Sequence, residues 1–98
     1  MIKYNVKVRQ QVKDYLDSLG PEPRHRLNLA LKALEAERGD ILALREALGG
    51  YCRLRVGSHR VIFRYQPGRV IDCVFVEERS LVYQLFEREV LERLQKAD

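Results

Sequence analysis

The sequence predicts an α+β fold: a small antiparallel β-sheet with an N-terminal helical hairpin packed on one face and a C-terminal helix, in the order β-α-α-β-β-β-α. Apolar residues recur at helical intervals before Gly39 and alternate with polar residues after Gly50. Glycines and prolines separate these periodic segments. Because 98 residues suffice for one hydrophobic core, we expect a single domain over residues 1–98.

The N-terminal part predicts one short strand and two helices. Residues 2–7 alternate apolar and polar side chains, as a strand does. An amphipathic helix follows from about Arg9 to Leu19, and the Gly-Pro pair at 20–21 ends it. A second helix starts at this pair and is ended by Gly39 and Asp40. The apolar side of the second helix consists of Leu27, Leu29, Ala30, Leu31 and Leu34.

Three strands are predicted after the helices. Residues 41–50 lead to them, either as a short helical turn or as an irregular connection. Strands then span residues 51–56 and 59–65 and are joined by a tight Gly-Ser turn. A third strand, residues 69–78, has the unbroken apolar centre of a sheet interior. Together the three form an antiparallel meander.

A last helix is predicted to begin near Tyr83. The apolar residues at helical spacing are Leu81, Val82, Leu85, Phe86, Val90, Leu91 and Leu94. Because the helical hairpin covers one face of the sheet, we expect the other face to be only partly covered.

Positive charge is concentrated in the predicted hairpin. The net charge is +4, and residues 51–70 contain five basic side chains and no acidic one. By the strand period of two, Arg53 and Arg55 share one face, and Arg60 shares a face with Arg64. If these faces coincide, they form a continuous basic surface that suits a polyanionic partner. The alternative is a solvated face, with arginine stems covering apolar surface and charged heads in water.

Aromatic and further basic residues favour a nucleic-acid partner. Tyr51 and Tyr83 could stack on exposed bases, and Arg79 follows the third strand beside the hairpin. The planar fork of an arginine matches two phosphate oxygens. We therefore expect Tyr51 and Arg64 to contribute to nucleic-acid binding.

The sequence does not predict a membrane span, a secretion signal or a metal site. No apolar run approaches the roughly 18 residues that a span needs, and the N-terminal residues lack an apolar signal core. Cys52 and Cys73 lack the spacing of a zinc site, so we interpret both as small core hydrophobes. We expect a cytoplasmic protein that uses no metal and no small-molecule cofactor.

Two segments resemble one known family. LGGYCRLRVGSHRVIFRY (48–65) and VFVEERSLVY (74–83) are similar to the RelE/ParE superfamily of bacterial and archaeal type II toxins. In the family's signature hairpin, a Gly-containing turn links a basic strand to a second strand. The predicted element order also matches, so the resemblance covers nearly the whole chain. RelE-like members cleave messenger RNA in the ribosomal A site, whereas ParE-like members inhibit DNA gyrase. We favour the RelE-like branch.

The resemblance implies roles for five residues. It places Arg53 and Arg55 at two basic positions of the ribonuclease site and Arg60 at a phosphate-binding arginine. It places Tyr83 near the scissile bond, and Arg79 is the nearest match to a second arginine at the end of the third strand. The implied reaction needs no metal: the ribose 2′-hydroxyl attacks the adjacent phosphate and expels the 5′-oxygen.

The proton acceptor is left open by the sequence. The two strand arginines stand where well-known members carry lysines, and arginine, with a pKa above about 12, is a poor general base. Tyr83 and His59 are the alternatives, with Glu77 and Glu78 as weaker ones. His59 is expected on the strand face opposite Arg60, where a packing role is favoured.

The implied partners are a cognate antitoxin, the ribosome and messenger RNA. An acidic antitoxin segment laid across the basic face would neutralise the charges that hold RNA. Two other interpretations stay open. One is a gyrase-inhibiting toxin, which needs no aligned catalytic groups. The other is a toxin fold that has lost activity and acts as a binding or repressor module.

Overall fold

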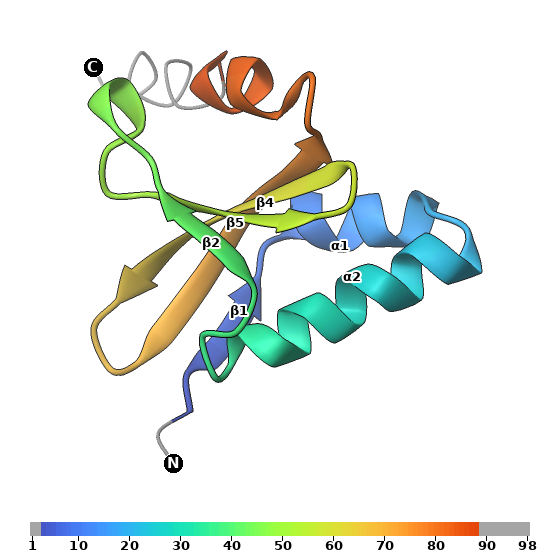
Figure 1. Ribbon diagram of the computed structural model, residues 1–98, viewed down its shortest axis with the longest axis horizontal. Coiled ribbons are helices and arrows are strands. Elements are labelled where there is room, and N and C mark those ends of the chain that lie inside the picture. Colours follow the sequence, from blue (N-terminus) through green and yellow to red (C-terminus); the bar gives the residue numbers. More distant parts are fainter. Residues whose placement is uncertain (1–2, 89–98) are drawn as a thin grey trace.

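The computed structural model describes residues 3–88 and has the predicted α+β architecture (Figure 1). Its elements are β1 (Asn5–Val8), α1 (Gln10–Ser18), α2 (Pro21–Leu34), β2 (Asp40–Ala43), η1 (Glu46–Leu48), β3 (Cys52–Val56), β4 (His59–Gln66) and β5 (Val70–Glu78). Helical residues 82–88 follow the last strand. Within this part of the chain, no helix has both the length and the apolar character needed to cross a membrane.

The five strands form one sheet in the order β1-β5-β4-β3-β2. The predicted antiparallel meander is confirmed in β3, β4 and β5, whereas β1 runs parallel to β5 and places Val6 opposite Ile71. The side chain of Gln11 in α1 continues the hydrogen bonding along β5 beyond the end of β1. Gln11 Nε2 donates to the carbonyl oxygen of Val76 at 2.8 Å, and Gln11 Oε1 accepts from the Val76 amide at 2.9 Å. The start of α1 is thereby fixed to the C-terminal part of β5.

Helices α1 and α2 cover one face of the sheet (Figure 1). The buried core between helices and sheet consists of Val12, Leu16, Leu27, Leu31, Leu34, Leu54, Val61, Phe63, Ile71, Cys73 and Val76. Leu29 was predicted on the apolar side of α2 but is 57% exposed. Two residues along an α-helix correspond to a rotation of about 200°, so Leu29 points away from the side that Leu27 and Leu31 bury.

The opposite face is only partly covered, as expected. The C-terminal helix, described over residues 82–88, packs there, and its buried cluster consists of Leu48, Ile62, Val74, Phe75, Val82 and Phe86. The predicted start near Tyr83 agrees with the observed start at residue 82. The predicted continuation through Val90, Leu91 and Leu94 lies outside the residues that the structure describes.

The connection between the helices and the meander differs from the prediction. Helix α2 ends at Leu34 rather than at Gly39, and Glu37 takes a left-handed φ of 54° that no helix continues. Asp40–Ala43 then forms strand β2, which pairs antiparallel with β3. This strand was missed because only Ile41 of its four residues is even partly buried. The helical turn expected as one alternative for residues 41–50 is present as η1.

Candidate functional site

Four arginines lie on the sheet face opposite α1 and α2, which we call the arginine face: Arg53, Arg55, Arg60 and Arg64. The β3–β4 ladder places Arg53 opposite Ile62 and Arg55 opposite Arg60. Ile62 packs under the C-terminal helix, whereas the intervening strand residues join the core beneath the helical hairpin. Because side chains alternate along a strand, the two basic strand faces coincide, as the sequence predicted conditionally.

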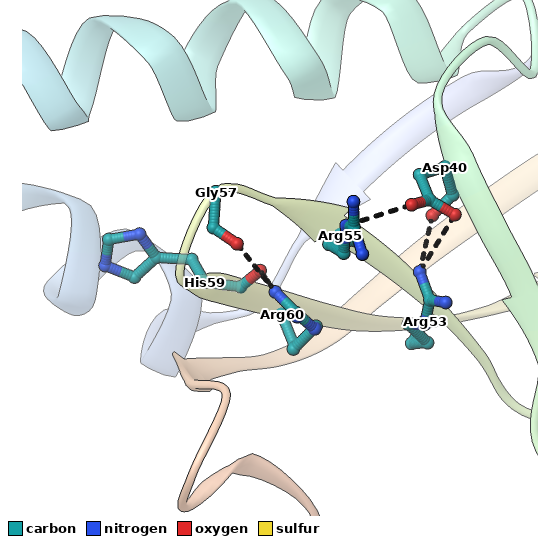
Figure 2. A network of polar contacts seen from close by, with 6 residues as sticks. All are labelled: Asp40, Arg53, Arg55, Gly57, His59 and Arg60. Atoms are coloured by element: carbon teal, nitrogen blue, oxygen red, sulfur yellow. Dashed lines mark hydrogen bonds and ion pairs between the residues drawn. The ribbon is translucent and has the colours of Figure 1, made fainter.

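A carboxylate from the unpredicted strand β2 lies between two of these charges (Figure 2). Asp40 Oδ1 accepts from Arg53 Nη1 at 3.1 Å, and Asp40 Oδ2 lies 3.0 Å from Arg55 Nε. Arg53 Nη1 also donates to the backbone carbonyl of Asp40 at 3.0 Å. The Arg53 side chain is 15% exposed and that of Arg55 is 58% exposed. The carboxylate of Asp40 therefore binds both a largely buried arginine, Arg53, and an exposed one, Arg55.

Two arginines, Arg60 and Arg79, donate hydrogen bonds to the turn between β3 and β4. Gly57 takes a φ of 59° at the first turn position, where a tight hairpin favours glycine. Arg60 Nη1 donates to the carbonyl oxygens of Gly57 and His59 at 2.8 and 2.9 Å (Figure 2). The backbone amide of Arg79 donates to the carbonyl of Ser58 at 2.8 Å. The side chain of Arg60 and the backbone amide of Arg79 thus bind the same turn, although the sequence places these residues at different strands.

Arg64 belongs to a second ion cluster on the same face. Its Nε lies 3.6 Å from Asp72 Oδ2, and Arg9 binds Asp72 through Nε at 3.3 Å and Nη2 at 2.9 Å. Asp72 is only 6% exposed. The Arg64 guanidinium carbon lies 5.8 Å from the centre of the Tyr51 ring, which packs edge-on against Phe86 at 4.9 Å. The structure brings Tyr51 and Arg64 together, and the Tyr51 ring also packs against Phe86 of the C-terminal helix.

His59 lies on the helical side of the sheet, away from Arg60, as predicted (Figure 2). Its ring packs edge-on against Tyr15 of α1 with centroids 5.6 Å apart, and Nε2 lies 3.6 Å from Glu78 Oε1. Burial, followed by the charge of Glu77, raises the pKa of Tyr15 to about 12. The structure does not bring His59 to the arginine face.

Tyr83 and Arg79 lie on the segment that leaves β5. Arg79 is exposed at the end of the strand, and Tyr83 is 36% exposed in the first turn of the C-terminal helix. Val82 and Phe86 hold that turn against the sheet because both are buried. The predicted site residues therefore come from β3 and the residue before it, from β4, and from the segment after β5 that includes the first turn of the C-terminal helix.

Solved structures share this fold. The toxin-antitoxin complex RelBE2 from Mycobacterium tuberculosis superposes with a TM-score of 0.71 at 22% identity, over 80% of this chain and 100% of that chain. The RelE-RelB complex from Pyrococcus horikoshii gives a TM-score of 0.65 at 28% identity, over 79% and 96%. The chain therefore has the fold of RelE- and YoeB/ParE-type toxins.

The RelE/ParE fold extends to a more distant structure. The YoeB-YefM complex from Staphylococcus aureus gives a TM-score of 0.61 at 19% identity, over 79% of this chain and 98% of that chain. No protein-family model and no curated protein sequence matches the chain. The likeness to these proteins therefore lies in the arrangement of strands and helices.

Two acidic residues of this RelE/ParE fold were missed by sequence reasoning. Asp72 carried a signal, because it interrupts the apolar run VIDCVFV and a buried charge needs a partner. Asp40 carried none, since its pairing with β3 depends on a strand that the sequence pattern did not reveal. Both acids bind arginines of the arginine face.

The cysteines have the expected packing role. Cys73 is fully buried in the core beneath the helices, and Cys52 packs against the same core while partly exposed. Both are free thiols, and burial raises the pKa of Cys73 to about 12. Among residues 3–88, no three histidine, cysteine or acidic side chains are grouped so that they could hold a metal ion.

Proposed function

We propose that this chain is the toxin of a type II toxin–antitoxin pair and that it cleaves messenger RNA on the ribosome. The observation that carries the proposal is the placement of Arg53, Arg55 and Arg60 on one sheet face, with Arg79 at the adjoining turn. Two similar folds come from complexes of a toxin with its antitoxin, which supports the toxin assignment. Since ribosomes are cytoplasmic, we assign the protein to the cytoplasm.

The arginines would bind the phosphate that is attacked. The two hydrogen bonds of Arg60 both use Nη1, so neither engages Nε or Nη2, which form one edge of the guanidinium fork. Arg55 is the open member of the Asp40 pair and would take a neighbouring phosphate oxygen. Attack by the 2′-hydroxyl places more charge on these oxygens, and fixed cations at that position lower the barrier.

We assign proton transfer to Tyr83. Arginine stays protonated at neutral pH and cannot accept a proton, and His59 lies on the other side of the sheet. Glu78 lies beside His59, and Glu77 interacts with Tyr15. Tyr83 is the remaining predicted acceptor, and its side chain is exposed in the helix that borders the arginine face.

A cognate antitoxin is the second proposed partner. Arg53 and Arg55 on the arginine face already bind the carboxylate oxygens of Asp40, at 3.1 and 3.0 Å. Acidic side chains of an antitoxin segment could bind in the same manner and exclude RNA. We expect this association to weaken as salt increases, and a salt-independent affinity would argue against its electrostatic part.

The test is cleavage mapping of a defined messenger RNA in a purified translation system, with and without ribosomes. The native protein and an Arg38→Ala control, which removes an exposed charge outside the arginine face, should give the same ribosome-dependent cuts. Arg60→Ala should lose them. Because Arg60 also ties the turn, Arg60→Lys is included, together with the thermal midpoint of each variant. An intact message with the native protein rules out the proposal.

One observation favours a binding toxin that inhibits DNA gyrase. Among residues 3–88, the arginine face holds no histidine, and Asp40 and Asp72 on this face are each paired with two arginines. A binding protein needs surface complementarity and no proton acceptor. A supercoiling assay with purified gyrase separates the two functions, since a ribonuclease leaves the supercoiling rate unchanged.

A further inference from the structure

Asp40 binds its two arginines unequally. Arg53 Nη1 donates both to the side chain and to the backbone carbonyl of Asp40, at 3.1 and 3.0 Å. Arg55 contacts the side chain through Nε at 3.0 Å. The exposed fractions of the side chains follow the same order, 15% for Arg53 and 58% for Arg55. The Arg53 side chain is therefore largely buried on the sheet surface, whereas the Arg55 side chain is exposed and bound only through one nitrogen.

The position of Asp40 is unfavourable for simple RNA affinity. It lies on an edge strand directly opposite Arg55, in the same row as Arg60 on β4. A carboxylate there repels an RNA phosphate and occupies donors that the phosphate would use.

The carboxylate of Asp40 also orients Arg55, which would otherwise be repelled by Arg60. Arg55 faces Arg60 across the ladder, and like charges at directly opposite positions push each other apart. Asp40 holds Arg55 toward β2, while the turn carbonyls hold Arg60. The two guanidinium groups are thereby fixed relative to each other before any ligand arrives, which is the condition for rapid charge stabilisation.

We propose that Asp40 is a positioning residue of the RNA site, an inference that rests on the proposed ribonuclease function. It holds Arg53 permanently and Arg55 exchangeably, so that an incoming phosphate oxygen replaces Asp40 at Arg55 Nε while Arg53 stays bound. RNA affinity is lowered by this charge, and the cleavage rate is raised by the alignment.

The first experiment compares Asp40→Asn with the native protein and with Glu22→Gln, which removes one negative charge from an exposed pair on α2. Affinity for a short single-stranded RNA should rise about threefold for Asp40→Asn at low salt, with a steeper salt dependence. Single-turnover cleavage at saturating ribosome complexes should fall about tenfold or more. Glu22→Gln should change neither quantity. A cleavage rate in Asp40→Asn equal to or above the native rate would overturn the positioning role.

A second readout does not depend on cleavage. The Nε–H signals of Arg53 and Arg55 are followed by nuclear magnetic resonance while inorganic pyrophosphate is added. In the native protein, the Arg55 signal should shift and the Arg53 signal should stay, whereas both should shift in Asp40→Asn. Equal shifts of both signals in the native protein, or none, contradict the exchange. If this pattern holds in a protein that cuts no message, the ribonuclease proposal fails and the phosphate exchange at Asp40 stands.

Discussion

Arg55 and Arg60 lie directly opposite each other on neighbouring antiparallel strands, yet their guanidinium groups bind different acceptors. Arg55 binds the carboxylate of Asp40, and Arg60 binds the carbonyls of the β3–β4 turn. Two like charges at this spacing destabilise a sheet unless each has a partner. The basic face is therefore compatible with a stable fold because its charges are held by acceptors already present in the chain.

Tyr83→Phe tests the assignment of proton transfer. The substitution removes only a hydroxyl, and the ring is 36% exposed, so the thermal midpoint should not change. Loss of a general acid or base lowers the rate by a factor of about 100 or more. We therefore expect ribosome-dependent cleavage to fall to that extent, measured in single-turnover reactions.

The control for this prediction is Tyr4→Phe, whose ring packs against Tyr65 in a different part of the protein. It should cleave at the native rate. If Tyr83→Phe also cleaves at the native rate, proton transfer belongs to another group, and the role of Tyr83 is limited to contact with bases.

Asp72→Asn should destabilise the protein. Asp72 is 6% exposed and binds Arg9 through two hydrogen bonds, and its loss of charge leaves the buried Nε of Arg64 without an ionic partner. Removing one member of a buried ion pair is costly, and because the Arg9 side chain is 36% exposed we expect a loss of about 2–4 kcal/mol in the free energy of unfolding.

Urea denaturation measures this loss, with Asp17→Asn as the matched control. Asp17 is exposed on α1, so its substitution should change the free energy of unfolding by less than about 0.5 kcal/mol. Equal stability of the two variants would mean that the ion cluster contributes nothing to folding.

The parts of the fold that the sequence predicted are those governed by local periodicity. The meander, the helical hairpin and the shared face of Arg53 and Arg55 follow from side-chain spacing, whereas the register of β3 on β4 places Arg60 on that same face. Strand β2 does not, because it is short, largely exposed and stabilised by its ladder to β3. For the same reason the Asp40 contacts could not be predicted, since they join residues that only the sheet order brings together.

Gly39→Ala should displace the strand that carries Asp40. Gly39 has a φ of 135°, and an added Cβ would lie 2.7 Å from Leu54 Cδ1. Leu54 is buried and has little room to move, so we expect a loss of about 1–3 kcal/mol in the free energy of unfolding. Gly50→Ala separates the two causes, because Gly50 has a left-handed φ of 91° but no atom within 4 Å of the added Cβ.

We expect the native protein to be the most stable, Gly50→Ala to be less stable and Gly39→Ala to be the least stable, as measured by urea denaturation. If steric contact with Leu54 is relieved without cost, the two alanine variants should be equally stable. Gly39→Ala should also weaken the contacts of Asp40, so its pyrophosphate-induced shifts should approach those of Asp40→Asn.

Tyr15 should make the stability of the protein fall at alkaline pH. Burial, then the charges of Glu77 and Glu78, raises the pKa of Tyr15 from 10.0 to about 12. The unfolded chain loses this proton first, so the stabilisation is fully present below about pH 10 and is lost as the pH rises toward 12. Tyr15→Phe removes this contribution and leaves that of the buried thiol of Cys73, whose raised pKa acts in the same direction.

The measurement is the difference in free energy of unfolding between the native protein and Tyr15→Phe, at about pH 9 and about pH 11. Because the native protein alone loses the tyrosine contribution, this difference should move in favour of the phenylalanine variant at the higher pH. Phenylalanine keeps the edge-on packing against the ring of His59, so the comparison isolates the hydroxyl. A difference that stays constant between the two pH values would show that the folded protein holds this proton no more tightly than the unfolded chain.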